Sequence, residues 1–112
     1  MSYRMFIDDL RNSPDDTWVV ARTSSEAIEY MRVHDCPIEI SFDHDLGGDD
    51  IAMRVVKEMV ERDLDSDGRF IPVGFKFFVH SANPVGARTI EGYLNGYLAQ
   101  RRDQEAHPIS AP

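Results

Sequence analysis

The chain has 112 residues, of which 12 are Lys or Arg and 20 are Asp or Glu, so its formal net charge is −8. This length fits one domain, and the negative charge argues against binding duplex DNA through phosphate contacts. The single cysteine excludes an internal disulfide and a cysteine-based zinc site. No stretch has the length of a membrane span or the pattern of a signal peptide, so we expect a cytoplasmic protein with no membrane contact.

The negative charge is concentrated in one half of the sequence. Residues 1–50 carry 12 acidic and 4 basic residues, a net charge of −8, whereas residues 51–112 carry 8 of each, a net charge of zero. Solubility alone does not require this segregation. A cation site, or a protein partner with basic character, explains it more easily.

Four short apolar runs and three segments with helical periodicity divide the chain. The predicted strands are residues 3–7, 17–21, 38–42 and 74–79. The predicted helices are residues 24–34, 51–63 and 84–102. Strands that alternate with helices in this order are typical of a parallel sheet with right-handed crossovers, so the predicted fold class is α/β. In this prediction residues 1–102 form a single domain and residues 103–112 form a flexible C-terminal tail.

Residues that favour the start of a helix precede all three predicted helices. Thr23 begins a Thr-Ser-Ser-Glu capping box before the first helix. Asp49 and Asp50 can cap the second helix, and Asn83 can cap the third. We therefore expect side-chain caps at these three positions.

Polar side chains follow three of the predicted strands directly. They are Asp8 and Asp9 after the first strand, Asp43, His44 and Asp45 after the third, and His80 and Ser81 after the fourth. The carboxyl ends of parallel strands share one edge of a sheet, so these side chains are expected to converge there. Carboxylate oxygens suit a hard cation such as Mg²⁺. Acids after strands also form turns and cap helices, but three such strand ends together favour a functional site.

Three stretches resemble the motifs of a known family. They are Ile7-Asp8-Asp9-Leu10-Arg11, Ser41-Phe42-Asp43-His44-Asp45-Leu46-Gly47 and His80-Ser81-Ala82-Asn83-Pro84. In this combination the sequence resembles the cyclic-phosphate processing receiver domain, a compact relative of the receiver domains of two-component signalling, over residues 5–98. Two features differ from an ordinary receiver domain: no full helix is predicted between the first two strands, and no fifth strand with the receiver lysine follows the fourth.

The resemblance implies both a fold and a kind of ligand. The implied fold is a compact receiver-like (flavodoxin-like) α/β fold with three layers and a short, mainly parallel sheet of about four strands. The implied ligand is a cyclic phosphate or cyclic nucleotide, with Mg²⁺ or Mn²⁺ as cofactor. In receiver domains the acid pair binds Mg²⁺, the next Asp accepts a phosphoryl group and a hydroxyl residue contacts it. Asp8 with Asp9, Asp43 and Ser81 match these roles in turn.

These considerations give three sets of candidate residues. The candidate metal ligands are Asp8, Asp9, Asp43 and Asp45. The candidate catalytic residues are Asp43, His44, His80 and Ser81. The candidate substrate-binding residues are Arg11, Asn83 and Arg88. The histidines can move a proton at a phosphoester oxygen, and the arginines can pair with a phosphate.

Two alternatives remain open at this stage. His44 and His80 can instead brace the loops through hydrogen bonds, and Arg88 can be an ordinary surface residue. The whole chain can be a metal-dependent phosphoester enzyme, or a non-catalytic receiver-like module that signals or binds a protein partner through its acidic edge. A shared fold does not choose between these two functions.

Overall fold

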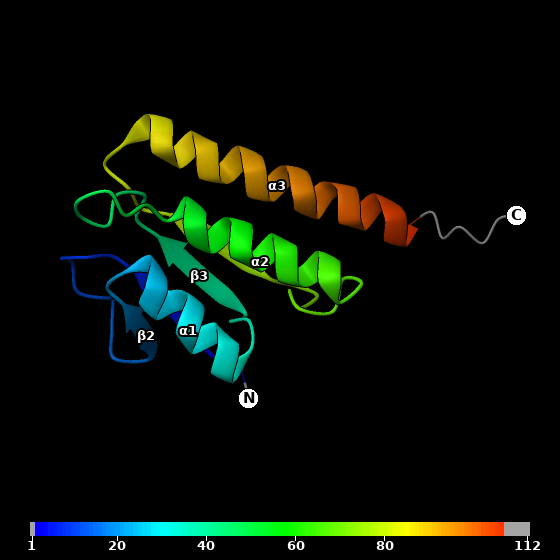
Figure 1. Cartoon of the computed structure of the whole chain (residues 1–112), viewed down its shortest axis with the longest axis horizontal. Helices are drawn as coiled ribbons and strands as arrows, with labels where there is room; N and C mark the ends of the chain where they lie inside the picture. The colour runs from blue at the N-terminus through cyan, green and yellow to red at the C-terminus, as the bar shows by residue number, and fades with distance from the viewer. Residues whose placement is uncertain (1, 107–112) are drawn as a thin grey trace, which may run out of the picture.

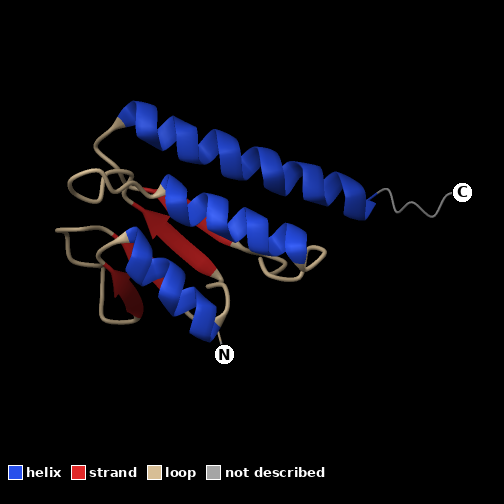
Figure 2. Ribbon diagram, in the orientation of Figure 1, coloured by secondary structure: helices blue, strands red, loops and turns tan. Residues whose placement is uncertain are grey.

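The computed structural model describes residues 2–106, and the side chains of residues 2–101 among them. Its elements, in chain order, are β1 (Arg4–Ile7), β2 (Trp18–Ala21), α1 (Ser24–His34), β3 (Glu39–Phe42), α2 (Met53–Asp65), β4 (Lys76–Val79) and α3 (Pro84–Ala106). The strands form one sheet in the order β2-β1-β3-β4, and every neighbouring pair is parallel. The predicted α/β class, with a parallel sheet of four strands, is therefore confirmed (Figures 1 and 2).

The last helix is longer than predicted. It continues to Ala106, four residues beyond the predicted end at residue 102, so the segment predicted as a tail begins with helix. The rest of that segment, residues 107–112, lies outside the described residues. The helix passes Arg101 and Arg102 without a break because neither Gly nor Pro occurs between them and Ala106.

Two of the three predicted caps are confirmed. The Thr23 side chain accepts a hydrogen bond from the Glu26 amide at 3.0 Å, and the Asn83 side-chain oxygen accepts one from the Gly86 amide at 3.0 Å. The prediction that Asp49 or Asp50 caps the second helix is wrong. That helix starts after Ala52, which makes no side-chain cap.

Asp50 instead binds the first turn of α1. Its carboxylate accepts hydrogen bonds from the Ser24 amide at 2.8 Å and from the Ser24 hydroxyl at 2.5 Å. Ile51, the next residue, still pairs with Asp45 in an isolated bridge, so α2 begins too late for Asp50 to reach its free amides. Asp50 therefore joins the start of α1 to the loop before α2, and a helix N-terminus favours such a charge.

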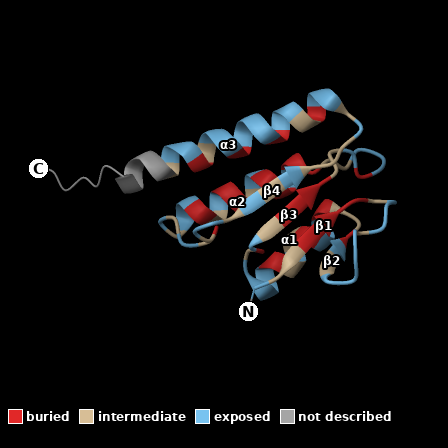
Figure 3. Cartoon of the chain, turned by 180° about the vertical axis from the view of Figure 1, so that it is seen from behind, coloured by how far each residue is buried: buried red, intermediate tan, exposed pale blue. Residues whose placement is uncertain are grey.

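All three helices lie on one face of the sheet, so the prediction of three layers is wrong. The strand side chains in the core, among them Met5, Ile7, Ile40 and Phe42, belong to one cluster with the inner residues of α1, α2 and α3. Seen from behind, the strands lie in front of α1 and α2, and α3 lies beyond β4 (Figure 3). The step from β2 to β3 and the step from β3 to β4 run in the same direction across the sheet, and right-handed crossovers then put α1 and α2 on the same face.

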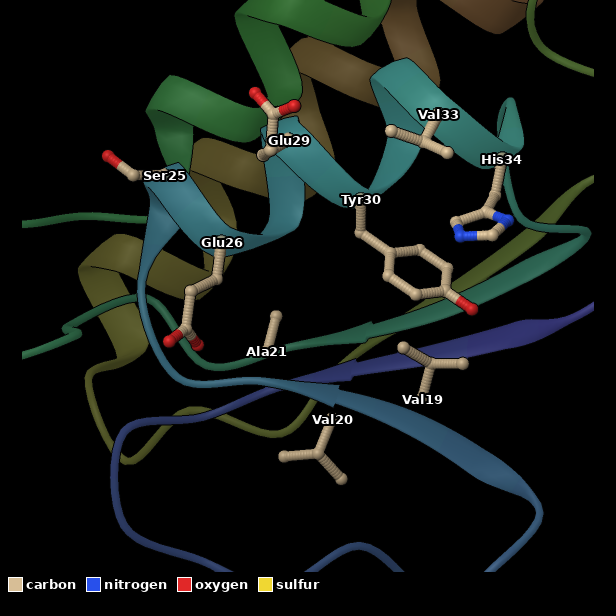
Figure 4. A pocket seen from close by; sticks show the side chains of 9 residues that line it. All are labelled: Val19, Val20, Ala21, Ser25, Glu26, Glu29, Tyr30, Val33 and His34. Carbon is tan, nitrogen blue, oxygen red and sulfur yellow. The ribbon is translucent and has the colours of Figure 1, made fainter.

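The opposite face of the sheet carries no helix from the described chain, and we call it the open face. A helix between β1 and β2 would cover it, because that step runs the other way, but residues 8–17 form a loop without a helix. Side chains alternate along a strand, so every second strand residue belongs to this face. These residues are Arg4, Phe6, Trp18, Val20, Glu39, Ser41, Lys76 and Phe78. Figure 4 shows the alternation on β2, where Val19 and Ala21 point toward α1 and Val20 points away.

Candidate functional site

The structure brings three of the predicted metal ligands together. Asp8, Asp9 and Asp43 each offer a carboxylate oxygen, and the three oxygens lie within 4.8 Å of one another. Asp8 and Asp43 are neighbours because β1 and β3 pair in register, with Ile7 opposite Phe42. We call Asp8, Asp9 and Asp43 the acid cluster.

Asp8 is buried and held on both carboxylate oxygens. Only 1% of its surface is exposed. Its Oδ1 accepts hydrogen bonds from the amides of Leu10 and Arg11 at 2.9 and 2.8 Å, and its Oδ2 accepts one from His80 Nε2 at 2.9 Å. Burial acts to raise the pKa of Asp8, but the two amides and His80 together outweigh it and lower that pKa. Asp8 is therefore ionised in the folded protein, with its orientation fixed.

Asp43 has the opposite electrostatic environment. Burial raises its pKa, and the negative charge of Asp8 raises it further. A hydrogen bond from the Ser81 hydroxyl and the charges of His80 and Arg11 act in the lowering direction but do not cancel this effect. The acid cluster thus carries more negative charge than its surroundings neutralise.

Asp9 lies beside the turn formed by Gly47. The φ angle of Gly47 is 92°, a left-handed conformation that favours glycine. A Cβ atom at this position would also lie 3.3 Å from Asp9 Oδ2, close enough to press on the carboxylate. The Gly-Gly pair in the sequence marks a turn, but only the structure places that turn against the acid cluster.

His80 occupies the end of the open face and has partners on both ring nitrogens. Its Nδ1 lies 2.7 Å from Ser41 Oγ and its Nε2 lies 2.9 Å from Asp8 Oδ2. Its ring stacks on Phe6, with centroids 4.5 Å apart and an angle of 3° between the planes. These contacts favour the interpretation that His80 braces the site, because neither nitrogen is free to take a proton from a substrate.

Ser41 is a site residue that sequence reasoning missed. It is 8% exposed and lies on β3, two positions before Asp43. In the tautomer that donates Nε2–H to the Asp8 carboxylate, His80 Nδ1 is an acceptor, and the Ser41 hydroxyl is then the donor. The signal for Ser41 was the period-two alternation of β3, which puts it on the same face as Asp43.

His44, Asp45 and Asn83 form a second group that lies apart from the acid cluster. Asp45 Oδ1 is 3.1 Å from His44 Nδ1, and Asp45 Oδ2 accepts a hydrogen bond from the Asn83 amide group at 3.1 Å. The Asn83 bond and then the His44 bond lower the pKa of Asp45. Asp45, a predicted metal ligand, is thus not brought into the acid cluster, which among the described side chains consists of Asp8, Asp9 and Asp43.

His44 also fixes the start of α3. A Cβ atom added to Gly86 would overlap the His44 imidazole ring, so the helix backbone packs directly on this ring. The His44 side chain is 14% exposed. Together with the Asn83 cap, this contact ties the loop after β3 to α3, which favours the bracing interpretation for His44.

Arg11 and Arg22 donate hydrogen bonds to the loops at the strand ends, whereas Arg88 makes no such bond among the described residues. Arg11 is half-exposed, donates to the His80 carbonyl at 2.9 Å, and brings its Nε to 3.9 Å from Asp8 Oδ2. Arg22, which was not predicted, donates to the Asp8 and Arg11 carbonyls at 3.0 and 2.6 Å. Arg88 is exposed on α3, and no contact within the described residues connects it to the acid cluster.

The acid cluster lies at an open edge rather than in the groove shown in Figure 4. That groove, of about 660 Å³, runs between α1 and β2 and is lined by Val19, Ala21, Tyr30, Val33 and other residues of these two elements. Its lining is largely apolar and includes none of the three clustered acids. The cluster chemistry therefore belongs to the carboxyl ends of β1, β3 and β4, where open α/β sheets bind ligands.

A parallel sheet of order β2-β1-β3-β4 with an acid pair after β1, an Asp after β3 and a hydroxyl residue after β4 defines a receiver-like α/β domain. The sequence model of the family described as the cyclic-phosphate processing receiver domain matches residues 3–96, so the chain belongs to this family. The resemblance in the sequence is thereby confirmed. Comparisons with curated proteins and with solved structures give no match. No helix within residues 2–106 is long and apolar enough to cross a membrane.

Proposed function

We propose that the chain binds a cyclic phosphate together with Mg²⁺ or Mn²⁺ at the acid cluster and opens the phosphate ring by hydrolysis. The observation that carries this proposal is the approach of three carboxylate oxygens to within 4.8 Å of one another. Like charges this close repel unless a cation or a proton neutralises them. The family match supports the cyclic phosphate as ligand.

The residues present fit a hard divalent cation. All three ligands are carboxylates, the donor type that Mg²⁺ and Mn²⁺ prefer. The raised pKa of Asp43 reflects burial and the neighbouring charge of Asp8, a charge excess that a cation would relieve. When bound, such a cation polarises a phosphoryl oxygen and lowers the pKa of a bound water.

Two side chains are placed to meet the phosphate. Ser81 donates its hydroxyl to Asp43, so it lies at the acid cluster and would bond a phosphate oxygen. Arg11 keeps a half-exposed guanidinium near Asp8, where it would pair with the phosphate charge. Asn83, whose side chain already binds Asp45 and the Gly86 amide, supports the loops instead.

The reaction needs one proton transfer. Water adds to phosphorus, one ring P–O bond breaks, and the proton of the water ends on the leaving alkoxide oxygen, which gives a phosphomonoester with a free hydroxyl. Both nitrogens of His80 have protein partners, so a carboxylate of the cluster accepts the proton first. We assign this step to Asp43, because both carboxylate oxygens of Asp8 already accept hydrogen bonds from the protein.

One observation favours a second candidate, a module that binds without turnover. His44 and His80, the residues predicted to move protons, both brace loops through contacts with Asp45, Ser41 and Asp8. In that case the acid cluster would bind a cation and a phosphate, and no bond would break.

The test compares ring opening with cation binding. The purified protein is incubated with 2′,3′-cyclic and 3′,5′-cyclic nucleotides in Mg²⁺, Mn²⁺ or EDTA. Ring opening is followed by ³¹P NMR, and cation binding is measured as the shift in the thermal unfolding temperature. We expect turnover that is lost in EDTA and in Asp43→Asn, and kept in Asp16→Asn, which removes an exposed acid outside the cluster. A cation-dependent thermal shift without turnover would select the module, and the absence of both would refute the proposal.

A further inference from the structure

The acid cluster is continuous with the open face of the sheet. Three hydrogen bonds extend the parallel ladder one residue past the strands, from the amides of Asp8, Asp43 and His80 to the carbonyls of Ala21, Ile7 and Phe42. Strand alternation therefore continues to these residues and puts their side chains on the open face. The stacking of His80 on Phe6 agrees with this placement.

The open face consists of three rows of side chains across the strands. The first row is Trp18, Arg4, Glu39 and Lys76. The second row, which we call the apolar strip, is Val20, Phe6, Ser41 and Phe78. The third row contains Asp8, Asp43 and His80. The apolar strip thus lies directly behind the acid cluster, one two-residue step away, or about 7 Å.

The apolar strip is exposed at both ends, and its two middle residues, Phe6 and Ser41, are buried. Phe78 is 52% exposed and Val20 is 37% exposed. Between them, Phe6 is buried by Trp18, which contacts its ring edge-on, and by His80, which stacks on it. The strip therefore offers one exposed aromatic ring, Phe78. His80, in the adjacent row of the acids, adds a second ring that is 21% exposed.

We propose that the apolar strip, together with the adjacent His80 ring, binds the base of a nucleoside cyclic phosphate, so that Phe78 and His80 select substrates that carry an aromatic ring. This inference rests on the proposed function, because the phosphate must lie at the acid cluster for the base to reach the strip. A ribose joins phosphate to base over a distance similar to the one-row step. Aromatic side chains stack on any base, since every base has a π face.

The size of the strip argues against a protein partner. Three gaps between neighbouring strands give a length of about 14 Å, and one row gives a width of about 7 Å, so the strip covers roughly 100 Å². A stable protein interface buries about 800 Å² on each partner. On one side the strip meets a row with three charged residues, and on the other it meets the acids, so it is not the centre of a larger apolar patch.

The experiment compares one substrate that has a base with one that lacks it. Adenosine 2′,3′-cyclic phosphate and glycerol 1,2-cyclic phosphate share the five-membered phosphate ring. With the full chain and Mg²⁺, thermal shift and Trp18 fluorescence measure binding and ³¹P NMR measures ring opening. We expect the adenosine compound to be preferred by about 5- to 150-fold, the range that one stacked base contributes.

Variants at Phe78 test the strip itself. Phe78→Ala and Phe78→Leu should remove most of the preference for the adenosine compound and leave glycerol 1,2-cyclic phosphate unaffected, because this compound does not reach the strip. Phe78 is half-exposed, so both variants should fold, and urea unfolding checks this. Tyr93→Ala is the matched control, since Tyr93 is an aromatic residue on α3 that is 43% exposed and lies outside the open face.

Four outcomes would overturn the inference. If both compounds bind equally, or if Phe78→Ala keeps the preference, the strip does not bind the base while the proposed function stands. If neither compound binds with Mg²⁺, the proposed function fails and the inference fails with it. If sedimentation shows a dimer that Phe78→Ala dissociates without a change in preference, the strip is an interface between copies of the chain.

Discussion

At the scale of single residues, the acid cluster combines one carboxylate that the fold stabilises with one that it does not. Asp8 has a lowered pKa because two amides and His80 outweigh its burial. Asp43, its neighbour across the β1–β3 pair, has a raised pKa because burial and the charge of Asp8 disfavour its ionised form. The sheet itself therefore produces a pair of unlike carboxylates, which is the usual requirement for acid–base chemistry.

This contrast predicts that Asp43→Asn stabilises the cation-free protein. A carboxyl group whose pKa is higher in the folded than in the unfolded state loses stability as pH rises through that interval, and near neutral pH the full penalty is present. Asn removes the charge next to Asp8 and keeps the shape. We expect a higher Tm in EDTA near pH 7, and loss of the additional stabilisation by Mn²⁺.

Asp8→Asn should instead lower the Tm in EDTA, because it removes a carboxylate that the fold stabilises through two amides and His80. If Asp43→Asn also lowers the Tm, the repulsion between Asp8 and Asp43 is not the main electrostatic effect at the cluster.

At the scale of secondary-structure elements, α3 is joined to the site by the contact between Gly86 and His44. An alanine normally stabilises a helix by about 1 kcal/mol relative to glycine. At Gly86 its Cβ would overlap the His44 ring. We expect Gly86→Ala to destabilise the fold by roughly 1–3 kcal/mol, the usual cost of overpacking, as measured by urea unfolding.

A double-mutant cycle isolates this contact. In the His44→Ala background the added methyl group has room, so Gly86→Ala should cost much less than it does alone. Gly92→Ala is the matched control, because a Cβ at Gly92 on the same helix would meet no described atom within 4 Å other than its chain neighbours and the nearby helix backbone. That variant should be stabilising. Strict additivity of the His44 and Gly86 changes would contradict the packing argument.

The connection from α2 to β4 depends on the buried carboxylate of Asp63. Asp63 is 0% exposed. It accepts hydrogen bonds from the amides of Phe70 and Ile71 at 3.0 and 2.8 Å, from the Tyr97 hydroxyl at 2.6 Å and from Arg101 at 3.1 Å. Burial opposes ionisation, but these bonds outweigh it and lower the pKa of Asp63. One side chain thus fastens α2, the loop before β4 and α3 together.

The lowered pKa of Asp63 gives its contribution a defined pH dependence. The stabilisation is fully present above the ordinary Asp pKa, about 3.9, and is lost as pH falls through the lower pKa of the folded state. We expect Asp63→Asn to reduce the free energy of unfolding by roughly 3–5 kcal/mol at neutral pH, because it breaks a buried ion pair. The difference from the unmodified protein should shrink in acid. Urea unfolding across this pH range measures it.

Asp65→Asn is the matched control for Asp63→Asn. It removes an exposed acid from the same helix and should change stability little at any pH. A destabilisation by Asp63→Asn that stays constant into strong acid would show that shape, rather than charge, accounts for the effect.

At the scale of the whole molecule, the acidic residues behind the net charge of −8 include two kinds. Many are exposed acids, and three others form the acid cluster. Exposed acids repel one another through water, and salt screens that repulsion, with a Debye length of about 10 Å at 0.1 M. The acid cluster is partly buried and its oxygens lie within 4.8 Å, so monovalent salt screens it poorly. A divalent cation bound at the cluster should therefore raise the Tm by an amount that ionic strength alone does not produce.

This separation can be measured by thermal unfolding. We expect NaCl raised to about 0.5 M to increase the Tm modestly, and Mn²⁺ at constant ionic strength to increase it further by specific binding to the folded state. Asp9→Asn should keep the effect of NaCl and lose the effect of Mn²⁺. If NaCl alone reproduces the whole Mn²⁺ shift, the cluster is not a specific cation site.

The sequence predicts the sheet and the acid cluster well for a physical reason. Period-two runs and strand-end acids are local signals, and parallel pairing carries Asp8 and Asp43 to one edge whatever the rest of the chain does. The number of layers depends on something non-local: the face that each crossover takes. The missing helix between β1 and β2 was visible in the sequence, but its consequence, an open face, follows only once the strand order is known.

The partners of the histidines were unpredictable for a similar reason. His80 meets Ser41 and Asp8 from 39 and 72 positions away, and no local pattern marks such pairs. Likewise, the acid at position 50 looks like a cap for the helix that follows it, but it reaches Ser24 on an earlier helix because the loop in between folds back. Loop geometry, rather than residue type, decides these contacts.

The two hydrogen bonds that Arg22 donates to the loop after β1 determine where this fold can accept an insertion. Arg22 donates hydrogen bonds to the carbonyls of Asp8 and Arg11 in the loop after β1. These bonds hold the segment that carries Asp8 and Asp9 in place up to residue 11. Residues 12–16, which follow this segment, are mostly exposed and lead to β2 at the edge of the sheet. An insertion at residues 12–16 should therefore leave the acids in position, because Arg22 holds the loop on their side of the insertion.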